Sequence, residues 1–453
     1  MPIDLLSILN TLGGPLAQID HFKAAHLQSL FRSKISKSQA TGKDGVRISR
    51  FEEILKEETL IIEKKIFSKT YKFTTFKERL ILRGSDRPPR QISIPTVRDR
   101  LTLRAICQVL HSHQSETVGK TPHELVRNVA SAIRAGDQTT KSFVRVDVKN
   151  FFPSISHAIL VRELRHFGFD EDVRALCTNA ISTPSGAATT QNMRGIPQGL
   201  SISAALAGLF MLRFDDLRKK EGPKYFRYVD DILLICDTKD AEIEIKNIGK
   251  KLASRGLIIH KAGVAGKTEI SPVADGVDFL GYRISIDLIS VRSSSYKRMF
   301  KNILKVTTDF RYRRNFDKLV FRLNLKITGC VVDSRRRGWM MFFSHTEDLQ
   351  QLARLDAFVS RLLSRMGFSV EQRSKIKRFV KTWHEIRYKM LETTYIPNFD
   401  LFDFSQKVNA VAALSGRKLA EVLSMDIESV ETLFSRLISR EVHDLEQDVG
   451  SPS

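Results

Sequence analysis

Residues 226–235 read Phe-Arg-Tyr-Val-Asp-Asp-Ile-Leu-Leu-Ile, so two adjacent carboxylates interrupt an otherwise apolar run. The pattern predicts a tight hairpin of two strands with Asp230 and Asp231 at its turn. A buried carboxylate without a partner is costly, and two neighbouring carboxylates also repel each other. A divalent cation that prefers oxygen ligands, Mg²⁺ or Mn²⁺, would compensate this charge. Because Asp-Asp is also common in ordinary turns, the pair alone leaves both interpretations open.

The composition indicates a globular protein with an anionic partner. The chain has 453 residues, 42% of them hydrophobic, which is enough for two or three packed units. Lys and Arg number 73 against 51 Asp and Glu, a formal net charge of +22. An excess of this size favours a nucleic acid over a membrane surface. The longest uncharged apolar run, 202–212, is too short to span a bilayer, so we expect no membrane partner.

The cysteines and the N-terminus point to a reducing compartment. Four widely spaced cysteines contain no CxxC pair, so neither a zinc site nor a disulfide framework is indicated, and each is expected to be a small core residue. The first residues show no secretion signal. A cytoplasmic location fits both observations.

The order of apolar patterns predicts an α+β protein. We expect a helix beginning near Val97, a strand over 143–148, helices over 158–180 and 200–219, and a small hairpin over 277–292 that contains Gly281. Beyond residue 293 the pattern becomes helical and rich in Arg and Lys, with apolar stripes over 349–366 and 423–437. Both stripes are typical of helix packing.

A third acid supports the metal interpretation of the hairpin. Asp147 lies 83 residues before Asp230 and ends the predicted strand 143–148. If the two strands are neighbours, Asp147 and Asp230 would share two metal ions that activate a 3′-hydroxyl and stabilise a leaving pyrophosphate. An acid at a strand end is common, so Asp147 alone decides little.

Two further segments suit a nucleotide site. Asn-Phe-Phe-Pro-Ser-Ile at 150–155 places the ring of Phe152 five residues after the acid, where it would clash with the 2′-hydroxyl of a ribonucleotide. For Phe151 we favour a core position. Arg-Gly-Ile-Pro-Gln-Gly-Leu-Ser at 194–201 predicts a turn whose glycines allow close backbone approach and whose Gln198 both donates and accepts hydrogen bonds. By itself this is an ordinary junction between a loop and a helix.

Together these segments resemble the palm signatures of reverse transcriptases, in order and in spacing. The segments are 146–155, 195–199 and Tyr-Val-Asp-Asp at 228–231. Flanking segments are also similar to those of bacterial and group II intron enzymes: 41–46, 90–95 with 98–100, 256–268 and 277–282. The resemblance covers about residues 40–290 and is specific as an ensemble.

The resemblance implies a right-hand polymerase. It predicts an N-terminal helical extension at 1–40, fingers and palm at 41–290, a helical thumb at 291–390 and a helical C-terminal extension at 391–453. Asp147, the Val148 carbonyl, Asp230 and Asp231 would bind two Mg²⁺ ions, with Mn²⁺ as an alternative.

The resemblance also implies roles for residues around the metals. Phe152 would exclude ribonucleotides, Gln198 and Tyr228 would contact the deoxynucleoside triphosphate, and Arg90 would hold its phosphates. Lys77 and Arg79 are weaker candidates for the same contact. Lys267 would neutralise or protonate pyrophosphate, although an ordinary surface lysine is a fair alternative.

In the predicted thumb, basic residues would contact the phosphates of a primer–template duplex. Phe279 and Gly281 belong to the primer-grip hairpin of the resemblance, and the basic candidates are Arg311, Arg313, Arg314, Arg335, Arg336 and Arg337. Tyr296, Tyr312 and Trp339 could stack on bases, though core packing is equally expected for Trp339.

Within the family, the chain looks most like bacterial defence-associated and abortive-infection reverse transcriptases. That likeness implies a structured noncoding RNA template, a DNA product or primer, a homo-oligomer or a second reverse transcriptase subunit, and a bacterial cytoplasm. A free-standing retron-type or group II intron-like enzyme stays open as an alternative. So does a catalytically silent RNA-binding scaffold, although all three acids are present.

Overall fold

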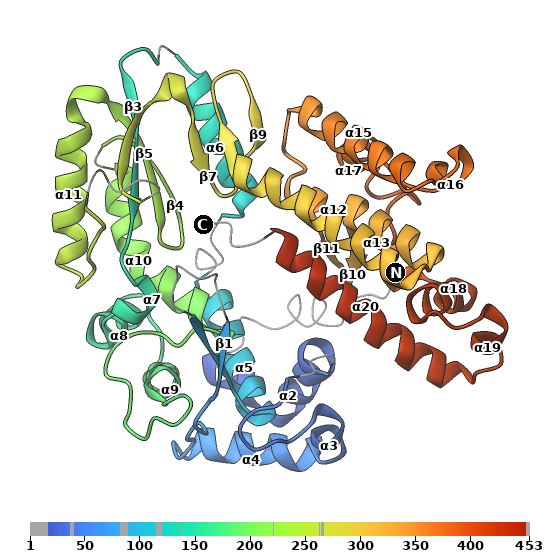
Figure 1. The fold of residues 1–453 in the computed structure, drawn as a ribbon. Helices are drawn as coiled ribbons and strands as arrows, with labels where there is room; N and C mark the ends of the chain where they lie inside the picture. Colours follow the sequence, from blue (N-terminus) through green and yellow to red (C-terminus); the bar gives the residue numbers. More distant parts are fainter. Residues whose placement is uncertain are drawn as a thin grey trace. The chain divides into compact units, whose positions relative to one another are not determined.

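The computed structural model describes residues 17–36, 40–81, 89–114, 120–136, 138–220, 222–261, 263 and 267–449 (Figure 1). The chain divides into two compact units. The first unit comprises 1–120 and 142–270, and the second comprises 121–141 and 271–453. Helices and sheets occur in both, which confirms the predicted α+β class.

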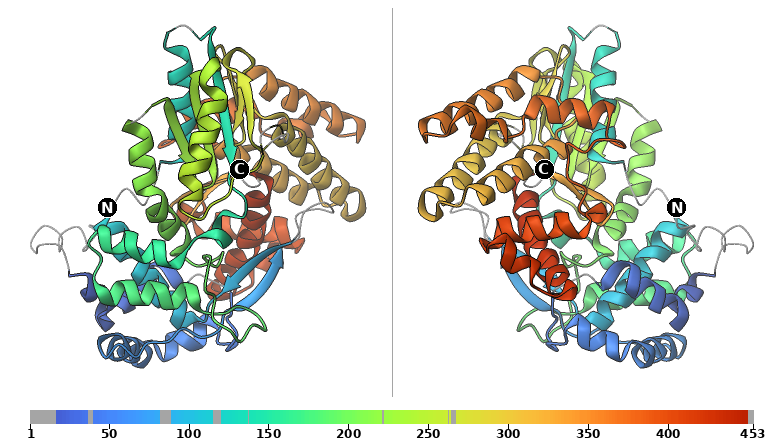
Figure 2. Two further views of the ribbon diagram at one scale, coloured as in Figure 1. Left: turned by 90° about the vertical axis from the view of Figure 1, so that its left-hand side faces the viewer. Right: turned by 90° about the vertical axis from the view of Figure 1, so that its right-hand side faces the viewer.

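The first unit is built on a four-stranded sheet. Its strand order is β4-β5-β3-β6, from β4 (Lys224–Tyr228), β5 (Asp231–Asp237), β3 (Lys141–Asp147) and β6 (Glu269–Pro272). The antiparallel β4–β5 pair confirms the hairpin predicted at 226–235. Helices α10 (Ser203–Lys220) and α11 (Ala241–Ala253) lie on one face of this sheet (Figure 2).

Seven further helices complete the first unit. They are α2 (Ala24–Leu30), α3 (Ile48–Glu53), α4 (Leu55–Phe67), α5 (Val97–His113), α7 (Phe151–Ser154), α8 (His157–His166) and α9 (Glu171–Ser182). Helix α5 begins where it was predicted, because the Thr96 hydroxyl accepts a hydrogen bond from the backbone N–H of Asp99. A separate antiparallel hairpin joins β1 (Lys77–Ile81) to β2 (Arg90–Ile94).

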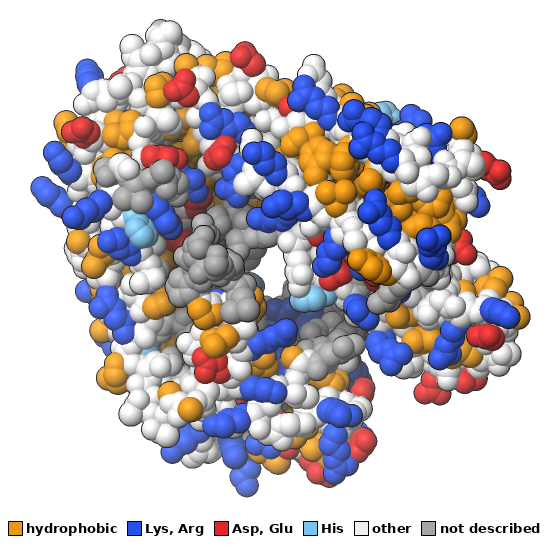
Figure 3. Space-filling view, viewed as in Figure 1, with side chains coloured by type: hydrophobic (Ala, Val, Ile, Leu, Met, Phe, Trp, Pro, Cys, Tyr) orange, Lys and Arg blue, Asp and Glu red, His pale blue; other side chains and the backbone are white. Residues whose placement is uncertain are grey.

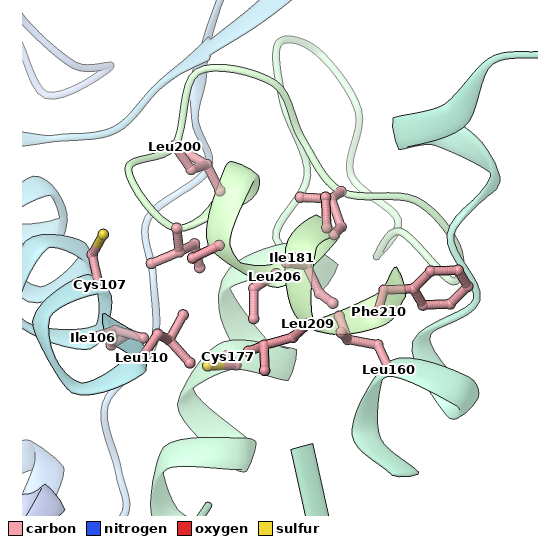
Figure 4. Close-up of a cluster of buried hydrophobic side chains, with 14 of the residues drawn as sticks. Ile106, Cys107, Leu110, Leu160, Cys177, Ile181, Leu200, Leu206, Leu209 and Phe210 are labelled. Atoms are coloured by element: carbon pink, nitrogen blue, oxygen red, sulfur yellow. The ribbon is translucent and has the colours of Figure 1, made fainter. Parts of the chain in front are cut away.

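The core of this unit lies where α5, α8, α9 and α10 meet (Figure 4). Ile106, Leu160 and Leu209 point toward one another from three of these helices, and Cys177 packs among them. All four cysteines are buried and free, as the sequence predicted.

The second unit is mainly helical. Its helices are α6 (Pro122–Arg134), α12 (Ser293–Arg313), α13 (Phe316–Thr328), α14 (Trp339–Phe342), α15 (Leu349–Arg365), α16 (Val370–Ser374), α17 (Phe379–Tyr388), α18 (Phe404–Ser415), α19 (Leu419–Leu423) and α20 (Ile427–Val449). Its strands are β7 (Val277–Phe279), β8 (Tyr282–Ile284), β9 (Ile289–Val291), β10 (Cys330–Val332) and β11 (Arg335–Arg337). Strands β7, β8 and β9 form one antiparallel sheet, and β10 pairs with β11.

Helix α6 comes from the middle of the chain but belongs to this second unit. Its Arg134 donates two hydrogen bonds to Glu347, at 3.1 and 2.7 Å, and a third to the carbonyl of Ile286 at 2.9 Å. His123, at the other end of α6, lies 2.6 Å through Nε2 from the carbonyl of Phe342. The chain therefore leaves the first unit at 120 and re-enters it at 142.

Four expected elements differ in detail. The predicted helix over 158–180 is two helices, because the chain turns at Gly168 with φ of 77°. The segment 277–292 contains three strands instead of two. Arg335, Arg336 and Arg337 form strand β11 and not a helix, and the stripe over 423–437 is divided between α19 and α20.

Charge and membrane propensity follow the composition. Lys and Arg side chains are spread over the face shown in Figure 3. In the part of the chain that the structure describes, no helix combines the length and the apolar character that crossing a bilayer requires.

Candidate active site

The turn between β4 and β5 is strained. Tyr228 pairs with Asp231 across the hairpin, which leaves Val229 and Asp230 as the two turn residues. Val229 has φ of 55°, the left-handed region that glycine usually occupies at the first position of a type II′ turn. Such a conformation costs a β-branched residue on the order of 1–3 kcal/mol. Surrounding contacts must therefore hold the turn.

A buried ionic network provides those contacts. Arg227 donates from Nε to the Asp215 carboxylate on α10 at 2.8 Å, and from Nη1 to the carbonyl of Val229 at 2.9 Å. The Tyr225 hydroxyl donates to the same carboxylate at 2.7 Å. Burial alone would lower the pKa of Arg227, but Asp215 outweighs it and raises that pKa, so the guanidinium stays charged. The turn is thus anchored to a core helix.

Backbone pairing fixes Asp147 at the end of β3. The N–H of His260 donates to the carbonyl of Asp147 at 3.0 Å, and the N–H of Lys149 donates to the carbonyl of Ile258 at 2.7 Å. These two bonds flank the antiparallel bridge between Val148 and Ile259. The carbonyl of Val148 takes part in neither of them, as a metal-binding role would require.

Asp147 and Asp230 interact electrostatically. Burial raises the pKa of the Asp230 carboxyl, and the neighbouring charges of Asp147 and Asp231 raise it further. Lys267 donates from Nζ to Oδ2 of Asp147 at 2.6 Å, and Nε2 of His260 lies 3.4 Å from the same oxygen. The structure therefore brings Asp147, Asp230 and Lys267 together, as the sequence predicted for the catalytic centre, although their catalytic roles stay predictions.

Asp231 is placed differently from its neighbour. Its carboxylate is buried, and Arg145 donates to both oxygens, from Nε at 3.0 Å and from Nη2 at 2.9 Å. This bidentate pair occupies the oxygens that metal binding would need. The predicted metal role of Asp231 thus has a competing structural explanation, in which Asp231 anchors the start of β5 to β3.

The two remaining acids suit Mg²⁺. In proteins this ion commonly takes one or two carboxylates and completes its shell with water and substrate phosphates. Asp147 and Asp230 are two crowded oxygen donors, and the raised pKa of Asp230 reflects negative charge that a cation would relieve. Among the described residues no group of three or more His, Cys, Asp or Glu side chains forms a complete protein cage. The donor set therefore fits an ion shared with a nucleotide.

Hydrogen bonds also join the predicted nucleotide-binding segments. Ile196 donates from its N–H to the carbonyl of Phe152 at 2.9 Å, and Ser93 donates to the carbonyl of Gln198 at 2.7 Å. Gly199 has φ of 105°, and a Cβ there would lie 2.7 Å from the carbonyl oxygen of Ser93, so the approach to β2 requires glycine. The ring of Phe152 is half-buried, whereas Phe151 is buried in the core as expected.

Three predicted phosphate-binding cations share one face of the β1–β2 hairpin. Lys77 pairs with Ile94, Arg79 with Ile92 and Arg90 with Ile81, and directly opposed side chains project to the same side. Arg90 donates from Nε to the side-chain oxygen of Gln198. Lys77 lies about 13 Å from Arg90 along the strands, so the two would hold different parts of a ligand. Tyr228 is half-buried, and burial raises the pKa of its hydroxyl.

The predicted duplex-binding residues fall in the second unit. Phe279 is buried, so its side chain is not available to contact a primer, and Gly281 follows it in the turn with φ of 82°. Arg311, Arg314, Arg335 and Arg336 are exposed, whereas Arg337 donates to Glu446. The side chain of Arg313 lies outside the described residues. Trp339 is buried and Tyr312 is exposed.

Sequence reasoning missed the cations that hold the site together. Arg145 stands two residues before Asp147, so strand alternation places both side chains on one face, and this signal was available. Arg194 donates to the carbonyls of Ser154 at 2.9 Å and Gly256 at 2.6 Å, partners that no local pattern reveals. Long-range partners of this kind become visible only in the fold.

Comparison with known proteins agrees with this site. Residues 83–284 match the family described as reverse transcriptase (RNA-dependent DNA polymerase). This segment contains Asp147, Asp230 and the Gln198 loop. The match supports the predicted RNA-directed DNA polymerase, and the mixed fold agrees with the predicted polymerase architecture.

Similarity to individual proteins is weak. Comparison with curated proteins finds no match. Among solved structures, apo telomerase from Candida tropicalis is 16% identical with a TM-score of 0.36, over 49% of this chain and 55% of that one. Telomerase from Candida albicans, in complex with a fragment of telomeric RNA, is 15% identical with a TM-score of 0.41, over 93% of this chain and 78% of that one. The match to the first spans about half of that chain's length.

Proposed function

We propose that this protein synthesises DNA on an RNA template by adding deoxynucleotides to a 3′-hydroxyl. The observation that carries the proposal is the meeting of Asp147 and Asp230 at a strained, anchored turn inside the reverse transcriptase domain. Asp147, Asp230 and the Val148 carbonyl would hold two Mg²⁺ ions, or Mn²⁺ in their place. When bound, such ions favour the ionised hydroxyl and neutralise charge on the leaving pyrophosphate.

The protein's own residues would select and orient the nucleotide. Arg90, with Lys77 and Arg79 on the same face, would bind the triphosphate. Gln198 would be oriented by Arg90 and by the backbone of Ser93, and Tyr228 would contact the nucleotide beside the turn. Phe152 would exclude the 2′-hydroxyl. Lys267 would deliver a proton to pyrophosphate as it leaves.

The second unit would bind the growing duplex. In this proposal 291–390 is the thumb, with Arg311, Arg314, Arg335 and Arg336 exposed for phosphate contacts. The segments 1–40 and 391–453 would be helical extensions of the polymerase.

A narrower proposal rests on the resemblance of the motif set to defence-associated enzymes. We propose a bacterial, cytoplasmic enzyme that copies a dedicated structured noncoding RNA during antiphage defence, as an oligomer or with a second reverse transcriptase. Sequencing of nucleic acid that co-purifies with the protein tests it. One recurrent RNA with complementary DNA supports the narrower proposal, and random cellular RNA contradicts it.

Primer extension tests the activity itself. Purified protein is given an RNA template, a DNA primer, deoxynucleotides and Mg²⁺, and Asp230→Asn is compared with wild type. We expect the variant to lose synthesis by at least about a thousandfold, since about 4 kcal/mol of transition-state stabilisation disappears. RNA binding should persist.

Asp216→Asn is the matched control, because Asp216 is a partly exposed aspartate on α10 that pairs with Lys219. It should retain synthesis. A wild-type protein that binds RNA but extends no primer would instead indicate a silent scaffold.

A further inference from the structure

A basic groove opens in the second unit, between α13 and α18. These helices pack side by side (Figure 1), and the groove between them has a volume of about 970 Å³. Five basic side chains and one acidic side chain, Asp317, line it. The basic residues are Arg314, Lys375, Lys377, Arg417 and Lys418.

These cations lack a carboxylate partner among the described residues, although Lys375 lies over the ring of Phe316 and Arg417 contacts the sulfur of Met425. Lys377 donates to the carbonyl of Tyr395 at 2.5 Å and is therefore occupied. Arg314, Lys375, Arg417 and Lys418 are exposed, and none of them has an ion pair with a carboxylate in the described part of the chain. The groove thus presents positive charge that the protein itself leaves uncompensated.

On the opposite face of α13 the basic side chains are paired with carboxylates. There Arg322 contacts Asp309, Glu441 and Asp444, and Lys326 donates to Asp448 at 2.5 Å. Three of these four acids belong to α20. The acidic face of α20 therefore neutralises one side of α13, while the basic residues of the groove on the other side lack carboxylate partners among the described residues.

The groove also carries side chains that can recognise bases. The amide of Asn409 is exposed and makes no hydrogen bond among the described residues, and Gln406 uses its oxygen for the N–H of Asp403. Both amides can donate to base edges. The partly exposed rings of Phe321 and Phe402 also line the groove and offer stacking surfaces.

We propose that this groove binds an unpaired segment of RNA, outside the reverse transcriptase domain. The inference rests on the proposed function for the identity of the nucleic acid. Lys375, Arg417 and Lys418 would contact phosphates, and Asn409 would contact a base. Unpaired bases expose the edges and faces that amides and rings require, whereas a duplex hides them.

Fluorescence anisotropy with the full chain tests the groove. The probe is a labelled unstructured RNA of about 12 nucleotides, a length within the usual range of single-strand sites. The protein carries Asp230→Asn and is saturated with unlabelled primer–template duplex, so that neither synthesis nor the polymerase site affects the signal. The test variant is Lys375→Ala with Arg417→Ala and Lys418→Ala.

The matched control removes three charges from exposed positions on α15, outside the groove: Arg354→Ala, Arg361→Ala and Arg365→Ala. We expect the groove variant to weaken RNA binding on the order of tenfold. The slope of log Kd against log salt concentration should also decrease by about two, because three phosphate contacts are lost and each contributes about 0.7 to the slope for a single strand. The control should change neither quantity comparably.

Cross-linking gives a second measurement that does not depend on a variant. RNA containing 4-thiouridine should cross-link to peptides within 402–419. Equal binding by the groove and control variants would overturn the inference, as would cross-links confined to other segments. Displacement of the RNA by polyglutamate at the same concentration as by unlabelled RNA would also overturn it. Failure of the proposed function would appear separately, as wild-type protein that extends no primer in the primer-extension assay.

Discussion

The two units leave opposite charges uncompensated. In the first unit Asp230 lies beside Asp147 without an ion pair of its own in the described structure, while Asp231 is fully paired with Arg145. In the second unit Lys375 and Lys418 in the groove have no ion pair with a carboxylate among the described residues, while Lys326 is paired with Asp448. Each unit thus contains a buried charge pair and, elsewhere, charge without an ion pair that is available for a ligand. Neighbouring residues of one chemical type therefore have different tasks.

The largest effect on stability is expected for Arg145→Met. This change removes the bidentate Arg145 partner of the buried Asp231 carboxylate, which should cost the first unit about 3–5 kcal/mol of unfolding free energy. Urea denaturation of the purified variant measures the loss. The double variant Arg145→Met with Asp231→Leu should recover much of it, because no buried charge then remains.

The same pair separates the two roles considered for Asp231. If Asp231 anchors β5, Asp231→Asn should lower stability more than Asp230→Asn does, while retaining more synthesis. If both variants are equally inactive and equally stable, Asp231 is a metal ligand and the proposed contrast between the two acids is wrong.

The substitution Lys326→Met tests the buried ion pair between Lys326 and Asp448 in the second unit. Because Lys326 and Asp448 are both buried, we expect a loss of about 3 kcal/mol in urea denaturation. Lys407→Met is the control, since its partner Glu431 is half-exposed and such pairs contribute less than about 1 kcal/mol. Equal losses in the two variants would show that burial does not distinguish these pairs.

A smaller effect is expected for Phe152→Ala. Removing the ring opens space for a 2′-hydroxyl, so discrimination between deoxynucleotides and ribonucleotides should fall about tenfold to a hundredfold. Single-nucleotide incorporation with matched dNTP and rNTP pairs measures the ratio within one variant. An unchanged ratio would remove Phe152 from the site, whatever the absolute rates.

The smallest change is expected for Val229→Gly. Glycine relieves strain of on the order of 1–3 kcal/mol but adds chain entropy to the unfolded state and loses the packing of the valine side chain. These contributions oppose each other, so the unfolding free energy should change by less than about 1 kcal/mol. A loss of several kcal/mol would show that side-chain packing, and not the Arg227 network alone, holds the turn.

The sequence predicted the elements whose cause is local. Alternation in 143–148 and the paired apolar runs around Asp230 predicted strands at the right places, and the helix expected near Val97 begins there. Prediction from the sequence failed where the interacting residues are far apart in the chain. Nothing near Arg145 indicates Asp231, and nothing near 335–337 indicates that Asp400 accepts hydrogen bonds from the backbone N–H groups of Asp333 and Ser334 and so supports a hairpin there.

The excursion of 121–141 into the second unit has a consequence for protein synthesis. Helix α6 leaves the ribosome long before Glu347, the partner of its Arg134, has been made. At about 5–20 residues per second the delay is on the order of ten to forty seconds. During that time the apolar face of α6, with Val126 and Val129, lacks its native cover. We therefore expect chaperones to bind the nascent chain at this stage. In the finished fold this apolar face of α6 is buried.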